Sequence, residues 1–382
     1  KNPDTFIIPT RNSVESLDPH FMNSSATRYI AYNVYDSLLA ATTQGEISPC
    51  LATEVPTIEN GLITTDADGK PHISFPIRDG VSYHNGNKLV AEDVKYTFMR
   101  GIISGGTTMT VTPALIGASN FKVLVEKVGL AEAFAKLDSA ITVEGNNVVF
   151  HLDAPFSPFL SIIADNGMSY GIMSKEWAVA EGAWPGTLGT LEENMSLTYQ
   201  TNALQGKVNG TGPFKLGSWE TERLVLERFD DYWQGPAKLH RVILQIVTES
   251  ATAVQQLLQG DADFYGVSLA ELLQVEGQQG IVVVRDLPVA QLLKVNFNFD
   301  IKGDQYLGSK TFGSEGAPPN MFSDINARKG FCYAFDRDKL INEVLLGGGL
   351  KPYGPVLVGY PTANPDNPCY SLDLAKAEEH FR

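Results

Sequence analysis

The sequence is poor in the residues that most often carry chemistry. It contains three cysteines and six histidines in 382 residues. Neither type occurs at the CxxC or HExxH spacing that is typical of metal and protease sites. We therefore predict no catalytic residues, no metal site and no cofactor. The histidines are scattered along the chain, at His20, His72, His84, His151, His240 and His380.

Long apolar runs are also missing. No segment approaches the roughly 18–20 apolar residues that a membrane-spanning helix needs. The chain opens on Lys1-Asn2-Pro3-Asp4 instead of the basic and apolar regions of a secretory leader. This start is the one expected of a mature protein whose signal peptide has been removed.

Positive charge is in short supply. Lys and Arg number 29 against 44 Asp and Glu, which gives a formal charge of −15. This negative net charge argues against a nucleic-acid partner and favours solubility. The hydrophobic content of 43% and the charged content of 19% are those of an ordinary globular protein. A chain of this length exceeds one hydrophobic core, so two or three domains are expected.

The clearest local pattern covers residues 73–100. Ile73, Phe75 and Ile77 alternate with other residues, as in a strand with one buried face. Two turn dipeptides, Asp-Gly and Asn-Gly, follow within ten residues. From about Ala91 the apolar spacing changes to that of a helix, whose first turn is acidic. The pattern predicts a strand–turn–strand–helix unit without reactive groups.

The same segment carries a family resemblance. Its order RDGVSYHNGNKLVAEDVKYTFMR, at residues 78–100, resembles the signature of solute-binding protein family 5. These proteins are the extracytoplasmic receptors of ABC importers for oligopeptides, dipeptides and nickel. Val90 departs from the usual capping Thr, Asn or Asp. Further similar segments lie at residues 45–52, 154–160, 209–216, 230–236, 260–264 and 322–341.

The resemblance implies an α/β fold of the type II periplasmic-binding-protein-like class, with two lobes and an extra small subdomain in the first lobe. Residues 1–44 and 156–266 would form the large lobe, and residues 45–155 the inserted subdomain. Residues 267–382 would form the first part of a second lobe. Family members run on further, so we expect this chain to be truncated at its C-terminus, with an incomplete second lobe and exposed edges.

The resemblance also supplies candidate ligand-binding residues. The Leu-Asp-Pro-His loop at residues 17–20 and the segment 163–173 line the ligand cleft in the family. The candidates are Phe21, Met22, Asn23, Asn166, Met168, Tyr170 and Asn298. For the apolar candidates the alternative is a role in packing. For Asn298 the alternative is a hydrogen bond to its own backbone. His20 is the one histidine at the presumed cleft, and its preferred role is a hydrogen bond within the turn rather than binding of a metal chelate.

Three other motifs have a structural and a functional interpretation. The glycine run at residues 210–212 lacks the Gly-Lys-Ser/Thr of a phosphate loop and precedes Pro213, so we predict a turn into a strand. The acidic residues of segment 65–70 predict a hairpin turn rather than a calcium loop. The neighbouring aromatic residues Tyr232 and Trp233 could stack against a sugar ligand, but the preferred interpretation gives them a structural role.

The remaining expectations concern local structure. The sequence allows two alternatives for the cysteines. Either Cys332 and Cys369 form a disulfide and Cys50 is free, or all three thiols are unpaired. Patterning predicts a strand at residues 5–8 that stops at Pro9, a helix at 27–39, loops at 104–119 and 303–319, and strands at 282–284 and 292–299. The family resemblance implies a further strand at 260–264.

The function that follows from the resemblance is that of a monomeric receptor, not an enzyme. It would capture a peptide or a similar small polar solute between two lobes by hinge closure and deliver it to an ABC-importer permease. The expected location is periplasmic or cell-surface, with a lipid anchor possible before trimming. The alternatives are a sugar or a nickel or other metal chelate as the ligand, and, more distantly, a hydrolase.

Overall fold

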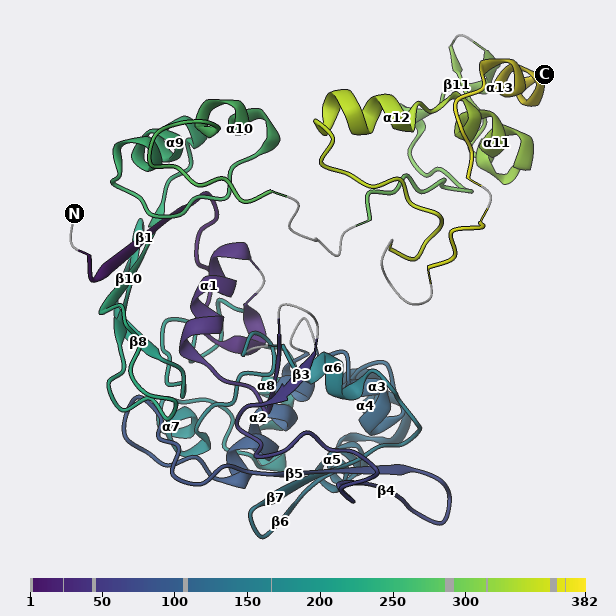
Figure 1. Ribbon diagram of the computed structural model, residues 1–382. Coiled ribbons are helices and arrows are strands. Elements are labelled where there is room, and N and C mark those ends of the chain that lie inside the picture. Colours follow the sequence, from purple (N-terminus) through teal and green to yellow (C-terminus); the bar gives the residue numbers. More distant parts are fainter. Residues whose placement is uncertain are drawn as a thin grey trace. The chain divides into compact units, whose positions relative to one another are not determined.

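The computed structural model describes residues 3–22, 24–42, 46–105, 109–165, 167–285, 292–313, 315–357, 363–367 and 369–382 (Figure 1). The chain divides into two compact units, residues 1–266 and residues 267–382. Each unit is described by itself. The assignment of the predicted lobes and of the inserted subdomain remains a prediction.

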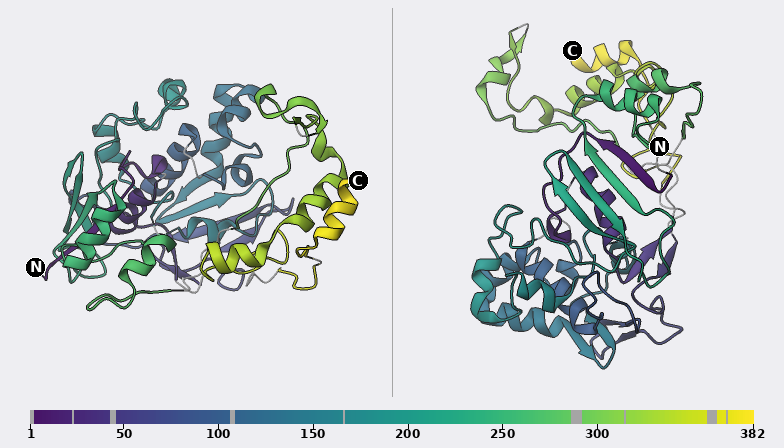
Figure 2. Two further views of the ribbon diagram at one scale, coloured as in Figure 1. Left: turned by 90° about the horizontal axis from the view of Figure 1, so that it is seen from above. Right: turned by 90° about the vertical axis from the view of Figure 1, so that its left-hand side faces the viewer.

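The first sheet of the larger unit has the strand order β1-β10-β9-β8. Strand β1 (Thr5–Thr10) pairs in parallel with β10 (Arg241–Ile246), which pairs antiparallel with β9 (Arg223–Arg228). Strand β8 (Phe214–Glu220) completes the sheet beside β9. Figure 2 shows the purple N-terminal strand lying beside the teal strands of residues 214–246.

The predicted ends of two elements in this region are wrong. Strand β1 continues through Pro9 to Thr10, because β1 is the edge strand and an edge tolerates a residue without an N–H. Helix α1 (Ser25–Val34) ends five residues before the predicted end at Leu39, and Leu39 instead begins β2 (Leu39–Ala41). Strand β2 pairs with β3 (Ile47–Pro49).

The second sheet is antiparallel throughout, in the order β4-β5-β7-β6. Its core-facing side chains include Phe75 and Phe150, whose rings meet edge to face at 5.5 Å, and Phe98 of helix α2 lies 4.7 Å from Phe150. The strands are β4 (Ile63–Thr65), β5 (Pro71–Pro76), β6 (Ile141–Glu144) and β7 (Asn147–His151). The helices beside them are α2 (Ala91–Ser104), α3 (Thr112–Ile116), α4 (Phe121–Val128) and α5 (Leu130–Ala140).

The segment 73–100 folds largely as its pattern predicts. It contributes β5 and α2, but the strand expected between the two turns is reduced to a bridge between Ser82 and Lys88. Val90 has no side-chain acceptor for the first turn of α2. Asp93 compensates from inside the helix, because its Oδ2 accepts the Val90 N–H at 3.1 Å and its Oδ1 accepts the Lys175 N–H at 2.8 Å.

The predicted hairpin turn at residues 65–70 is confirmed by the pairing of β4 with β5. The predicted loop at 104–119 contains α3.

The glycine run at residues 210–212 turns into β8 as predicted, and it also packs against the end of α1. The Gly212 N–H donates to the Val34 carbonyl at 2.9 Å. A Cβ added to Gly210 would lie 1.9 Å from that carbonyl oxygen. Any larger residue at position 210 therefore displaces backbone rather than a flexible side chain.

We expect Gly210→Ala to lower the free energy of unfolding by about 1–3 kcal/mol, the usual range for overpacking a close contact. Chemical denaturation measures this change. The matched control is Gly189→Ala, since a Cβ at Gly189 meets nothing within 4 Å. Equal stability of the two variants would contradict the proposed close approach.

Short helices complete the larger unit. They are α6 (Phe159–Ile163), α7 (Lys175–Ala180), α8 (Leu191–Asn194) and α9 (Ser250–Gln259). The segment 260–264 was expected to be a strand. It has no regular structure, and Asp263 Oδ2 instead accepts the Ile7 N–H at 2.9 Å at the free edge of β1.

The smaller unit contains α10 (Leu269–Val275), β11 (Gly308–Gly313), α11 (Ile325–Ala334), α12 (Arg337–Lys339) and α13 (Leu374–Phe381). The predicted strands at 282–284 and 292–299 are wrong for the described residues, which have no regular structure there. Val282 is 87% exposed, and no neighbouring strand pairs with it among the described segments. The predicted loop at 303–319 contains β11.

Candidate functional site

The two predicted cleft segments of the larger unit meet around Tyr35, just after α1. The Tyr35 hydroxyl donates to the Leu17 carbonyl at 3.1 Å. On its other side, a Cβ at Gly167 would lie 2.4 Å from the Tyr35 carbonyl oxygen, and the Ile172 N–H donates to the Asp36 carbonyl at 2.9 Å. The structure thus brings residues 17–22 and 167–172 together, although about 150 residues separate them in the sequence.

A buried carboxylate shapes the second of these segments. Asp165 accepts backbone N–H groups from Gly167 at 3.2 Å, Ser169 at 2.5 Å and Tyr170 at 3.0 Å. Burial raises the pKa of Asp165 to about 6, and these three hydrogen bonds oppose the rise. The carboxylate therefore fixes the loop that carries Met168 and Tyr170.

The described candidates differ in accessibility. Phe21, Met22 and Tyr170 are buried, at 8%, 2% and 2% exposure, and the Tyr170 ring lies 5.4 Å from that of Phe98. Met168 is half-buried. Burial of the first three favours the packing alternative, and a ligand role for Met168 stays a prediction. Asn23 and Asn166 lie outside the described residues.

Asn298, the candidate from the smaller unit, is exposed. Its Oδ1 accepts the Asp300 N–H at 3.1 Å, which is the backbone hydrogen bond of the alternative interpretation. Its amide nitrogen leaves a donor for a ligand, so its binding role also stays a prediction.

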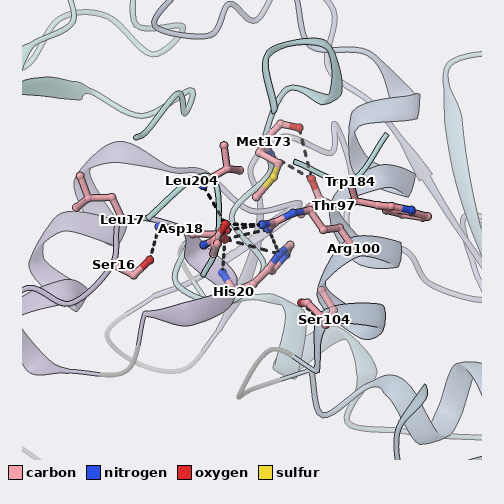
Figure 3. A network of polar contacts seen from close by, with 12 residues as sticks. Ser16, Leu17, Asp18, His20, Thr97, Arg100, Ser104, Met173, Trp184 and Leu204 are labelled. Atoms are coloured by element: carbon pink, nitrogen blue, oxygen red, sulfur yellow. Dashed lines mark hydrogen bonds and ion pairs between the residues drawn. The ribbon is translucent and has the colours of Figure 1, made fainter. Parts of the chain in front are cut away.

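A buried ion pair joins the first segment to helix α2 (Figure 3). Arg100 of α2 holds Asp18 through two hydrogen bonds, Nη1 to Oδ1 at 3.1 Å and Nη2 to Oδ2 at 2.5 Å. Asn202 joins both partners, since its Oδ1 accepts from Arg100 at 3.1 Å and its Nδ2 donates to Asp18 at 2.8 Å. His20 Nδ1 lies 2.7 Å from Arg100 Nη1. The ion pair is 0–1% exposed.

The charges of this network are set by its burial. Burial alone would raise the pKa of Asp18, but the Arg100 guanidinium outweighs it and holds that pKa below its usual value. Burial, and then the charge of Arg100, lower the pKa of His20 to about 3. His20 is therefore neutral, and its Nδ1 accepts the hydrogen bond from Arg100. The network ties the loop after β1 to α2 and exchanges no proton near neutral pH.

Sequence reasoning missed this network. It treated the segment that contains Arg100 only as a helix with an acidic first turn and placed His20 in a turn, and it did not consider Asn202. A signal was present, because an arginine within the apolar pattern of α2 requires a buried partner. Nothing in the sequence says that the partner is Asp18, 82 residues away.

The structural interpretation of Tyr232 and Trp233 is confirmed. Both donate to the buried carboxylate of Asp36, the Tyr232 hydroxyl at 3.3 Å and Trp233 Nε1 at 3.1 Å. Thr211 Oγ1 donates to the same carboxylate at 2.8 Å. These hydrogen bonds give the two side chains a structural role.

Residues 167–171 read GMSYG, which matches the GxSxG spacing of a hydrolase nucleophile elbow and went unnoticed in the sequence. An elbow needs a strand before the serine and a helix directly after it. Here α6 ends at Ile163 and α7 begins at Lys175, with no strand between them in the described residues. Ser169 is 2% exposed. The match therefore lacks the geometry of an exposed nucleophile.

Other potential sites are limited. All three cysteines are free, so the predicted alternative of a Cys332–Cys369 disulfide is not formed. In the described part of the chain no three or more His, Cys, Asp or Glu side chains group to hold a metal, and no helix has the length and apolarity to cross a bilayer. A surface pocket of about 490 Å³ lies beside Tyr96 and Trp184, away from the candidates.

Comparison with known proteins places the chain in one family. The model of the bacterial extracellular solute-binding proteins, family 5 Middle, matches residues 46–382. A probable D,D-dipeptide-binding periplasmic protein of Escherichia coli is 24% identical over 381 residues, and the oligopeptide-binding protein AppA of Bacillus subtilis is 26% identical over 322 residues. The alignments cover 99% and 82% of this chain but 62% and 48% of those proteins.

Solved structures agree on the fold. AppA of Bacillus subtilis in complex with a nonapeptide has a TM-score of 0.66 at 19% identity, covering 99% of this chain and 63% of that one. NikZ of Campylobacter jejuni in complex with Ni(L-His) has a TM-score of 0.65 at 16% identity, covering 100% and 63%. The predicted α/β, type II periplasmic-binding-protein-like fold is confirmed.

Proposed function

Because this chain belongs to the bacterial extracellular solute-binding proteins, family 5, we propose that it captures a small peptide and presents it to the permease of an ABC importer. Members of this family are solute-binding receptors rather than enzymes. The similarity to peptide-binding relatives over nearly the whole chain supports the proposal most directly. We place the receptor outside the cytoplasm, as a monomer, in keeping with its periplasmic relatives.

The proposed binding mode uses the segment 167–172, which Asp165 and Tyr35 fix and which offers the half-buried side chain of Met168. Asn298, which is exposed, is a separate candidate that offers an amide. A thioether adapts to different side chains, and an amide suits the peptide backbone. Hinge closure then follows if the ligand binds the closed form more tightly than the open one.

A thermal-shift panel tests this proposal. It contains di- to pentapeptides, oligosaccharides and nickel chelates. We expect peptides to raise the melting temperature of the full-length protein, because a ligand that binds the native state alone stabilises it. A response to sugars or chelates alone keeps the fold and overturns the peptide ligand.

The Met168 side chain gives a sharper test. We expect Met168→Ala to weaken peptide binding by roughly tenfold, the equivalent of about 1.4 kcal/mol of lost contact. Met195→Ala is the matched control. Met195 is also half-buried, but it packs against the hydrophobic core that contains Phe75, Phe98 and Phe150, whereas Met168 packs against a different core. Equal affinity of both variants would remove Met168 from the binding site.

A metal chelate is the second candidate ligand. It is favoured by one observation, the fold similarity to NikZ in complex with Ni(L-His). Peptide-binding relatives outnumber it among the most similar proteins, which is why peptide is preferred.

A further inference from the structure

Two histidines face each other across the second sheet, on the side away from its helices. His72 of β5 and His151 of β7 are direct cross-strand partners. Their Nδ1 atoms are 2.6 Å apart, and their rings meet edge to face at 4.7 Å. Both side chains are partly accessible to solvent.

The register of the ladder explains this approach. The neighbouring pair is joined by a backbone hydrogen bond from the Leu152 N–H to the Pro71 carbonyl at 2.9 Å. Hydrogen-bonded and non-hydrogen-bonded pairs alternate in an antiparallel ladder, so His72 and His151 form a non-hydrogen-bonded pair, in which side chains lie closest. The backbone therefore holds the two imidazoles together.

The outer nitrogen of each ring has its own polar partner. His72 Nε2 lies 3.8 Å from the Asp66 carboxylate, and His151 Nε2 lies 2.7 Å from Thr142 Oγ1. The carboxylate favours a proton on His72 Nε2, which leaves the lone pair of His72 Nδ1 directed at His151.

In one arrangement of the protons, His151 Nδ1 donates to His72 Nδ1 and the Thr142 hydroxyl donates to His151 Nε2. If the His151 proton moves to Nε2 and the Thr142 hydroxyl turns to accept it, both Nδ1 lone pairs face the same point. This tautomer change releases no net proton. Outer partners of this kind orient metal-binding imidazoles in proteins.

We propose that His72 and His151 bind a divalent transition-metal ion through their Nδ1 atoms, as a clip between β5 and β7. Imidazole ligands suit Zn²⁺, Cu²⁺ and Ni²⁺. Bonds of about 2.0–2.1 Å at angles of about 90–110° place the two nitrogens roughly 2.9–3.4 Å apart, so the rings must rotate outward to hold the ion. Asp66 orients His72 without binding the metal, and water completes the coordination.

This site is separate from the proposed solute-binding segments. It lies on β5 and β7, and none of the ligand-binding candidates is on that sheet. The two histidines are 79 positions apart in the sequence, so a search for closely spaced metal ligands does not find them.

Calorimetric titration of zinc chloride into the chelator-treated, tag-free protein tests the proposal. We expect one Zn²⁺ per chain, with binding at least tenfold weaker in His72→Gln and in His151→Gln. We expect Asp66→Asn to weaken binding by about 10–100-fold, the usual effect of removing an outer partner. Asparagine keeps the oxygen that accepts the Asp68 and Lys70 N–H groups in the turn.

The matched control is His240→Gln, which removes an exposed histidine elsewhere and should bind Zn²⁺ like the wild type. A second measurement uses only the wild type: Cu²⁺ spin-echo spectroscopy should detect two bound imidazoles. Absence of Zn²⁺ binding, equal binding by the two histidine variants and the control, or fewer than two bound imidazoles would overturn the site.

Discussion

Arg100→Met is expected to lower the free energy of unfolding by about 3–5 kcal/mol, the usual cost of removing one partner of a buried ion pair. Methionine keeps much of the side-chain volume, so the loss reports the charge rather than a cavity. Asp18 would remain buried without its cationic partner, with Asn202 and the backbone N–H of His20 as its main remaining donors. Chemical denaturation at pH 7 measures the change.

The matched control is Arg241→Met, which breaks the exposed pair between Arg241 and Glu227. Both of its side chains are 46% exposed, and exposed pairs of this kind contribute about 0–1 kcal/mol. If the two variants lost similar stability, the buried network would not hold the loop after β1 to α2.

Acid is expected to destabilise the protein by several kcal/mol between pH 6.5 and pH 4, and His20 is the largest single cause. Its pKa is lowered from 6.5 to about 3 by burial and then by the charge of Arg100, and a tenfold change in a proton-binding constant corresponds to about 1.4 kcal/mol. The His20 contribution is complete above pH 6.5 and is lost as the pH falls toward 3, because the unfolded chain takes up the proton first.

Other ionisable groups act in the same window, among them the half-buried residues His84 and Asp165. Burial lowers the pKa of His84 to about 4, which adds to the loss in acid. Burial raises the pKa of Asp165 to about 6, which opposes it, since a carboxyl with a raised pKa favours the folded state as the pH falls. The wild-type curve alone therefore does not isolate His20.

A difference measurement does isolate it. His20→Gln retains an oxygen that can accept from Arg100 but has no proton to gain, so its stability should fall less steeply between pH 6.5 and 4 than that of the wild type. His240→Gln controls for the loss of a histidine as such. If His20→Gln and the wild type showed parallel curves, His20 would not be neutral and buried in the folded protein.

The segment 73–100 shows what sequence reasoning can predict. Its strand and helix are local patterns, and both formed where the apolar spacing placed them. The approach of residues 17–22 to 167–172 was also anticipated, but through the order of family motifs and not through physical chemistry. The ends of α1 and β1 were wrong because strand pairing, a tertiary effect, decided them.

The polar contacts between residues far apart in the sequence could not be predicted from local sequence patterns. Asn202 and Asp18 lie 184 residues apart, and the two histidines of the proposed metal clip lie 79 residues apart. Only the packing of α2 and the register of β5 on β7 bring them together. The same holds for Gly330 of α11, because the Phe381 ring that an added Cβ would meet at 2.6 Å belongs to α13 and cannot be identified from local pattern.

The central claim, that this chain is a peptide receptor, is tested most directly by calorimetric titration of the full-length protein with the peptides that raise its melting temperature, followed by mass spectrometry of the recovered ligand. We predict saturable binding of one peptide per chain and recovery of the peptide intact. Recovery of cleaved peptide, or binding of sugars or chelates without any peptide, would contradict the claim.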